Sequence, residues 1–129
     1  MFKTKIPVQE KIDDGNGNIK TQKREIAVTV DTSIFAEERW EKYFPTNAKS
    51  ETLFAYIERV HENRMLDKAH ILSNLKALYC FLESDELSDF KSFCQLFDLA
   101  DVKYLQTLCD KIKWIFGIVL GSSVSPPKN

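Results

Sequence analysis

The residues whose types could support chemistry are few and are poorly spaced for it. His61 and His70 stand nine residues apart, on either side of an expected helix break. A helical zinc motif needs histidines at i and i+4 and a third ligand nearby, which favours a surface or core-edge position for both. Segment 13–18 (Asp-Asp-Gly-Asn-Gly-Asn) lacks the ligand spacing of a calcium loop, and it predicts a hairpin turn.

Acidic residues form two groups, and both lie near the starts of predicted helices, where the helix dipole favours negative charge. No serine or cysteine stands in a motif that would pair it with a base. We therefore expect no catalytic residues, no metal ion and no cofactor, and we predict that the chain is not an enzyme. The two acidic groups are Glu37, Glu38 and Glu41, and Asp85, Glu86 and Asp89.

Composition and charge narrow the class of protein further. The chain has 129 residues, 43% of them hydrophobic, which is enough for one domain with a packed core. The net charge of −1 argues against a general nucleic-acid binder. Residues 1–30 carry a net charge of +2 and the remainder −3, a small imbalance that could help copies stack head to tail.

The cysteines and the chain ends predict a cytosolic protein. Cys80, Cys94 and Cys109 are odd in number and form no Cys-x-x-Cys pair, so we expect reduced cysteines in the core. The first residues show no signal peptide. The longest apolar run, residues 114–120, is too short to span a membrane, so no membrane partner is expected.

The first 30 residues predict a β-hairpin, because apolar and polar residues alternate on both sides of the turn. Pro7 makes the first strand an edge, and a lone hairpin is marginal in water. The hairpin must therefore lie on the helical body or pair with another molecule. We predict self-association through its apolar residues, which are Phe2, Ile6, Val8, Ile26 and Val28.

Five amphipathic segments follow, at about 34–43, 48–62, 65–83, 85–98 and 102–120, with a disordered tail expected at 121–129. Ser84 and Asp101 are expected to cap the last two helices. The predicted fold class is mainly α: a compact bundle of about five helices in residues 31–120, with an N-terminal β-hairpin in residues 1–30 and roughly 60% helix, above the usual globular share.

The last predicted helix carries more apolar surface than one core face requires. A stripe roughly 100° wide faces the core, and an apolar flank continues beside it. Either the helix is buried centrally, or the flank is a partner-binding surface. The residues of this flank, predicted to bind a partner, are Tyr104, Trp114, Ile115 and Ile118.

Two segments resemble a known family. They are residues 31–45 (DTSIFAEERWEKYFP) and residues 51–60 (ETLFAYIERV). With the chain length and the helix-rich remainder, they are similar to the tail assembly chaperones of lactococcal and related long, non-contractile-tailed phages. The resemblance is clearest over the second strand of the expected hairpin and the first two expected helices, about a third of the chain. It rests on packing residues, so no catalytic residue carries over.

The resemblance implies a role in virion assembly. Such a chaperone coats the long, hydrophobic, helical tape measure protein in many copies until the tail tube polymerises around it. We accordingly expect two partners, the tape measure protein and further copies of this chain. The expected location is the host cytoplasm, with the protein absent from the mature virion. The alternative is a small cytosolic adaptor or regulator that binds one protein partner through a helical groove.

Overall fold

Two long strands form the N-terminal hairpin in the computed structural model, which describes residues 1–84, 87–122 and 126–127. β1 (Phe2–Asp13) pairs antiparallel with β2 (Ile19–Val30), in unbroken register from Phe2 opposite Val30 to Asp13 opposite Ile19. Gly15 and Gly17 have φ values of +89° and +84°, which glycine adopts without strain. The predicted hairpin and its turn are confirmed.

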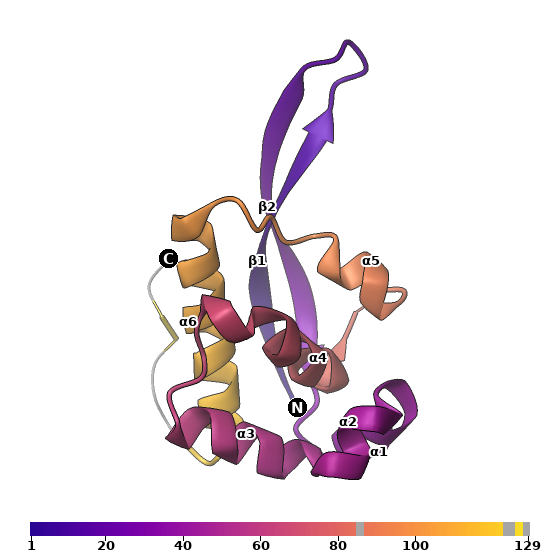
Figure 1. The fold of residues 1–129 in the computed structure, drawn as a ribbon, viewed down its shortest axis with the longest axis vertical. Coiled ribbons are helices and arrows are strands. Elements are labelled where there is room, and N and C mark those ends of the chain that lie inside the picture. Colours follow the sequence, from indigo (N-terminus) through magenta and orange to yellow (C-terminus); the bar gives the residue numbers. More distant parts are fainter. Residues whose placement is uncertain (85–86, 123–125, 128–129) are drawn as a thin grey trace.

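The two halves of the hairpin have different surroundings. In the half far from the turn, the alternate residues Ile6, Val8, Ile26 and Val28 are buried against the helices. Every residue from 11 to 25 is exposed, and Figure 1 shows this part extending well beyond the helices. We call residues 11–25 the distal ribbon.

A short third strand, β3 (Leu82–Glu83), pairs antiparallel with the end of β2 and gives the sheet order β1-β2-β3. The helical elements are α1 (Phe35–Tyr43), α2 (Pro45–Ser50), α3 (Leu53–Glu62), the 3-10 helix η1 (Lys68–His70), α4 (Ile71–Phe81), α5 (Phe90–Cys94) and α6 (Val102–Val119).

The prediction of a mainly α bundle with about five helices is wrong. The described residues form six α-helices and a three-stranded antiparallel sheet and are 51% helical, so the fold is mixed α/β. The sheet is part of the core, because the buried side chains of the hairpin and of the helices form one hydrophobic cluster. Amphipathic patterning revealed the helices but could not show that a strand follows α4.

Three helix boundaries differ from expectation for local reasons. The helix expected at 48–62 is two helices, because Thr52 is extended and its side chain caps α3 by accepting from the N–H of Ala55 at 3.1 Å. The helix expected at 65–83 begins at Ile71 and ends at Phe81, whose carbonyl accepts from the N–H of Asp31 at 2.7 Å. The chain is thereby drawn into β3.

The helix expected at 85–98 is reduced to α5. Its cap is Asp89, which accepts from the N–H of Ser92 at 2.7 Å, and not Ser84, whose hydroxyl donates to the carbonyl of Ala27. Residues 85–86 lie outside the described residues, as do 123–125 and 128–129 of the predicted disordered tail.

Helix α6 matches its prediction closely, including the cap, since Asp101 accepts from the N–H of Tyr104 at 3.0 Å. It packs against β1 as well as against α3 and α4. Contact with both the sheet and other helices explains why its apolar surface is so wide. None of the helices in the described part of the chain combines the length and apolar character needed to cross a bilayer.

Candidate protein-binding groove

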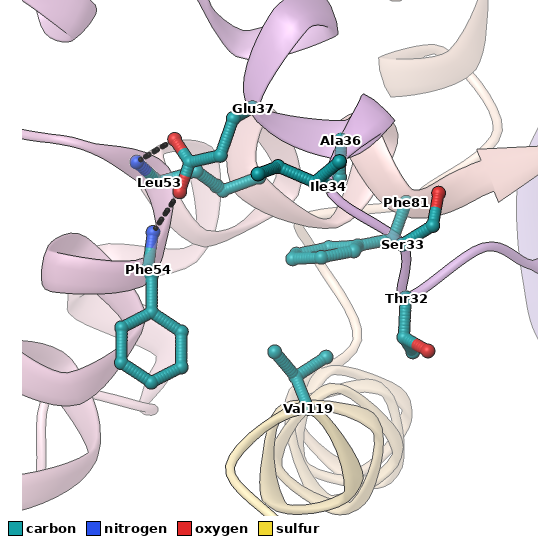
Figure 2. A pocket seen from close by; sticks show the side chains of 9 residues that line it. All are labelled: Thr32, Ser33, Ile34, Ala36, Glu37, Leu53, Phe54, Phe81 and Val119. Carbon is teal, nitrogen blue, oxygen red and sulfur yellow. Dashed lines mark hydrogen bonds between the residues drawn. The ribbon is translucent and has the colours of Figure 1, made fainter.

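An apolar groove lies at the end of the molecule opposite the distal ribbon, where α1, α3 and the last turn of α6 meet (Figures 1 and 2). Its volume is about 320 Å³. We call it the α1–α3–α6 groove. Nine residues line it: Thr32, Ser33, Ile34, Ala36, Glu37, Leu53, Phe54, Phe81 and Val119.

The groove combines a buried floor with an exposed apolar rim. Ala36, Leu53 and Phe81 belong to the core. Ile34 and Phe54 are 85% and 47% exposed, although both are large and apolar. Contiguous apolar surface that water can reach typically marks a site of contact with another molecule. The arrangement can therefore hold an apolar side chain or a short apolar segment of a partner.

The carboxylate of Glu37 fixes two walls of the groove relative to each other. It leaves α1 and accepts hydrogen bonds from the main-chain N–H of Leu53 at 2.8 Å and of Phe54 at 2.9 Å (Figure 2). These N–H groups belong to the first turn of α3, where an anion is favoured by the helix dipole. Since both oxygens of Glu37 serve as a cap, this residue has a structural explanation and need not act as an acid or base.

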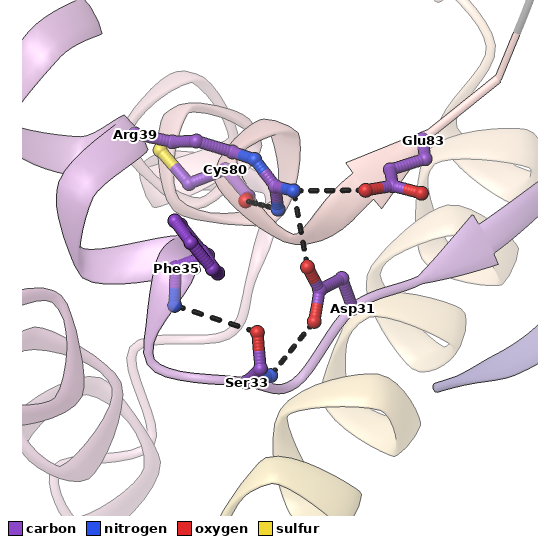
Figure 3. Close-up of polar contacts among 6 residues, drawn as sticks. All are labelled: Asp31, Ser33, Phe35, Arg39, Cys80 and Glu83. Atoms are coloured by element: carbon purple, nitrogen blue, oxygen red, sulfur yellow. Dashed lines mark hydrogen bonds and ion pairs between the residues drawn. The ribbon is translucent and has the colours of Figure 1, made fainter.

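A polar cluster that shares Ser33 with the groove holds the chain that leads into α1. One guanidinium nitrogen of Arg39 donates to Asp31 at 3.0 Å and to Glu83 at 2.9 Å, and the other donates to the carbonyl of Cys80 at 3.0 Å (Figure 3). Asp31 also accepts from the N–H of Ser33 at 2.9 Å. The cluster joins α1 to the end of α4 and to β3.

The pKa values around this cluster have clear causes. Hydrogen bonding from Ser33, and then from Arg39, lowers the pKa of Asp31 below its usual range. Burial raises the pKa of Cys80 to about 12, so its thiol is protonated at neutral pH and is a poor nucleophile. No group of three or more His, Cys, Asp or Glu in the described residues is placed to hold a metal ion.

The flank predicted to bind a partner lies mostly inside the molecule. Tyr104 and Ile115 are buried, and the hydroxyl of Tyr104 donates to the main-chain oxygen of Pro7 at 2.8 Å. Trp114 and Ile118 are half-buried. The expectation that this flank lies outside the core is therefore wrong for Tyr104 and Ile115, because α6 packs against β1 as well as against other helices.

Trp114 has specific partners within the chain. Its ring meets that of Phe2 edge to face, with centroids 5.8 Å apart. The Lys111 ammonium lies 4.5 Å from the centroid of the Trp114 ring, a cation–π distance. Burial, as the main cause, lowers the pKa of Lys111. The contact with Phe2 ties the C-terminal half of α6 to the start of β1.

The apolar residues predicted to mediate self-association also face the chain's own helices. Ile6, Val8, Ile26 and Val28 are buried, and Phe2 is half-buried beside Trp114. The hairpin thus docks within its own chain, and these side chains are not displayed to a second copy. A third strand and the helical layer stabilise the hairpin, which removes the reason for expecting it to pair elsewhere through these residues.

Sequence reasoning missed the groove residues Ile34 and Phe54. One signal was available for Phe54, since it falls outside the apolar stripe of its helix, which consists of Leu53, Tyr56, Ile57 and Val60. An apolar residue off the stripe must be exposed or must meet another element. The position of Ile34 beside it could not be read from the sequence, because it depends on how α1 and α3 pack.

Comparison with known protein families, with curated proteins and with solved structures finds no match to this chain.

Proposed function

We propose that this protein is a phage tail assembly chaperone that covers apolar helical segments of the tape measure protein before the tail tube polymerises. The observation that carries the proposal is the exposed apolar rim, Ile34 and Phe54, of the α1–α3–α6 groove. A chaperone for many different apolar segments needs adaptable apolar contact more than hydrogen-bonded specificity. The groove offers that kind of contact.

The position of the family resemblance supports the same proposal. Residues 31–45 and 51–60, which resemble the phage chaperones, supply seven of the nine lining residues. Only Phe81 and Val119 come from elsewhere. The resembling segments therefore supply most of the lining of the α1–α3–α6 groove, which is what a shared binding role would require.

The direct test is coexpression with a tape measure protein from a phage of this type, followed by affinity capture. The Ile34→Ser, Phe54→Ser double variant should lower the amount captured by roughly tenfold or more, because exposed apolar anchors dominate such contacts. Its fold should persist, since both side chains are exposed. The control is Leu72→Ser, which changes a 56% exposed leucine outside the groove. Equal capture by all three proteins would refute the role of the groove.

A one-to-one adaptor is the second candidate, and the small size of the groove, about 320 Å³, favours it. Light scattering over a range of concentrations separates the two. A coating chaperone should form assemblies whose mass grows with concentration, either alone or on its partner, whereas an adaptor should stop at a fixed stoichiometry. A chaperone that acts in the host cytoplasm should also be absent from purified virions, so its detection there would contradict the proposal.

A further inference from the structure

We propose that the outer edge of β2, from Ile19 to Lys23, binds an extended acidic segment of a partner protein, which adds to the distal ribbon as a further β-strand. This site lies at the opposite end of the molecule from the α1–α3–α6 groove (Figure 1). It goes beyond the proposed function and does not depend on it.

The direction of the main-chain groups follows from Gln9. Its N–H donates to the carbonyl of Leu96 at 3.2 Å, and its carbonyl accepts from the N–H of Asp98 at 2.7 Å, so both groups point away from β2. Gln9 lies opposite Lys23, which makes this a non-hydrogen-bonded pair of the ladder. Because such pairs alternate along an antiparallel ladder, the main-chain groups of Lys23, Thr21 and Ile19 point outward from the hairpin.

The two edges of the hairpin differ in what blocks them. On β1, Pro7 has no N–H and its carbonyl accepts from Tyr104, while Gln9 is fully used by the segment 96–98. On β2, β3 covers only Thr29 and Val30. Within residues 1–84, 87–122 and 126–127, no hydrogen bond reaches the outward main-chain groups of Ile19, Thr21 or Lys23. An open edge of this kind is a template for one more strand.

Charge identifies the kind of strand that fits. From Ile19 to Lys23, the edge carries Lys20 and Lys23 and no carboxylate. Beyond this stretch, Arg24 pairs with Glu10 of β1 at 3.9 Å. Lys20 and Lys23 lie on opposite faces of the ribbon, because their positions differ by an odd number. A strand with carboxylates on both faces would place opposite charges beside each other across the new ladder, which stabilises strand pairing.

The same charges disfavour a second copy on this edge. Two β2 edges paired about a two-fold axis would bring the cations of both ribbons onto one sheet. With Gln22 at the axis, Lys20 would stand opposite Arg24. Like charges in opposed positions destabilise a ladder, and lysines on an edge strand are a known protection against self-pairing.

Fluorescence anisotropy with two labelled heptapeptides tests the proposal on the full chain. The acidic probe is acetyl-Thr-Glu-Glu-Val-Glu-Glu-Thr-amide, and the matched control probe has lysine in place of each glutamate. We expect saturable, salt-sensitive binding of the acidic probe alone. The Lys20→Glu, Lys23→Glu double variant should reverse this preference, with a change of at least ~10-fold in affinity for each probe.

A proline distinguishes strand addition from simple charge attraction. Thr21→Pro removes one outward N–H and leaves the bonds between β1 and β2 in place, so it should abolish probe binding while the circular dichroism spectrum is retained. Thr21→Val keeps the N–H and should bind like the original chain.

Four results would overturn the proposal. They are equal binding by Thr21→Pro and Thr21→Val, no binding of the acidic probe by the folded chain, tighter binding of a single-stranded oligothymidine than of the acidic probe, and concentration-dependent self-association that Thr21→Pro abolishes. The third result would assign the ribbon to nucleic acid and the fourth to a second copy. Neither would bear on capture of the tape measure protein by the groove.

Discussion

The hydroxyl of Tyr104 on α6 donates a hydrogen bond of 2.8 Å to the main-chain oxygen of Pro7 on β1, although the two residues are 97 positions apart. Pro7 has no N–H, so this carbonyl is the only main-chain hydrogen-bonding group at that position. The bond occupies the outer edge of β1 at Pro7 and joins the N-terminal strand to α6. It also explains why a tyrosine on the apolar flank of α6 does not have to reach solvent.

Removing this hydroxyl should destabilise the protein without changing its fold. Tyr104→Phe leaves the Pro7 carbonyl without its partner while keeping the aromatic packing, so we expect a loss of about 1–2 kcal/mol in the free energy of unfolding. Urea unfolding at neutral pH measures it. The control is Tyr43→Phe, since Tyr43 is exposed and should change stability by less than about 0.5 kcal/mol. Equal losses in both variants would contradict the assigned role of the bond.

Stability should fall at alkaline pH because three buried acids are held in their neutral forms. Burial raises the pKa of Cys80 and of Tyr56 to about 12 each, and it raises the pKa of Tyr104 further. Their unfolded pKa values are the ordinary 9.0 and 10.0. A group whose folded pKa is raised contributes its full stabilisation below the unfolded pKa and loses it as pH rises towards the folded pKa.

The free energy of unfolding should therefore be constant up to about pH 8.5 and decline above it, by up to ~1.4 kcal/mol per pH unit for each group. Urea unfolding between pH 7 and 11 measures the decline. Cys80→Ala should reduce the decline between pH 9 and 10, where buried thiols contribute more than the tyrosines. Burial also raises the pKa of Cys109, so part of the decline should remain. A stability that is flat to pH 11 would show that these groups are not buried in solution.

Arg39 should be important for stability because it neutralises a buried carboxylate. Arg39→Met would leave Asp31 without its cation and the Cys80 carbonyl without its donor. We therefore expect the free energy of unfolding to fall by about 2–4 kcal/mol. Asp31→Asn should lower the free energy of unfolding by less, because it removes the charge that Arg39 balances and keeps an acceptor for the N–H of Ser33. Differential scanning calorimetry at neutral pH would rank the two variants, and the opposite order would contradict this account.

The lowered pKa of Asp31 adds an acid-side test. Hydrogen bonding to Ser33 and Arg39 holds this pKa below the ordinary 3.8, so its contribution is present above about pH 4 and is lost as pH falls through the folded pKa. Between pH 5 and pH 2, the stability of Asp31→Asn should depend less on pH than that of the original chain. The same pH dependence in both proteins would remove Asp31 from the explanation of acid unfolding.

The hairpin should be indispensable at its base and dispensable at its tip. Deleting residues 1–30 removes Ile6, Val8, Ile26, Val28 and Val30 from the core. At roughly 1.5–3 kcal/mol for each buried aliphatic side chain, the loss is comparable to the whole stability of a domain. We expect an unfolded product by circular dichroism.

A shortened hairpin provides the contrast. Replacing residues 13–19 with Asn-Gly puts a two-residue turn between Ile12 and Lys20, which are paired in the ladder. Every residue from 11 to 25 is exposed, so the melting temperature should stay within a few degrees of the original. Unfolding of this variant would mean that the distal ribbon stabilises the body.

Trp114 should be a packing residue more than a surface anchor. Trp114→Ala loses the edge-to-face contact with Phe2 and the cation–π contact with Lys111, so we expect a loss of about 1–3 kcal/mol in stability. Tape measure capture, measured below the melting temperature, should be unchanged, because Trp114 does not line the α1–α3–α6 groove. Weakened capture with unchanged stability would instead support the flank as the binding surface.

Local signals in the sequence were sufficient for the hairpin and for α6. Alternating apolar residues and two glycines in the turn predict β1 and β2, because strand periodicity and positive φ are properties of a few neighbouring residues. The capping carboxylate of Asp101 and the helical periodicity after it predict α6 almost to the residue. The resemblance of residues 31–45 and 51–60 to the phage chaperones is likewise a property of the sequence alone.

Tertiary structure decided the rest, because it depends on contacts between distant segments. The pairing of β3 with the end of β2 ends α4 at Phe81 and makes the fold mixed α/β. The flank of α6 looked available to a partner, but Tyr104 bonds to Pro7 of β1, which lies 97 positions earlier, and Tyr104 and Ile115 are both buried. Apart from the position of Phe54 outside the apolar stripe of α3, the groove has no sequence signature, since Ile34, Phe54 and Val119 meet only when α1, α3 and α6 pack together.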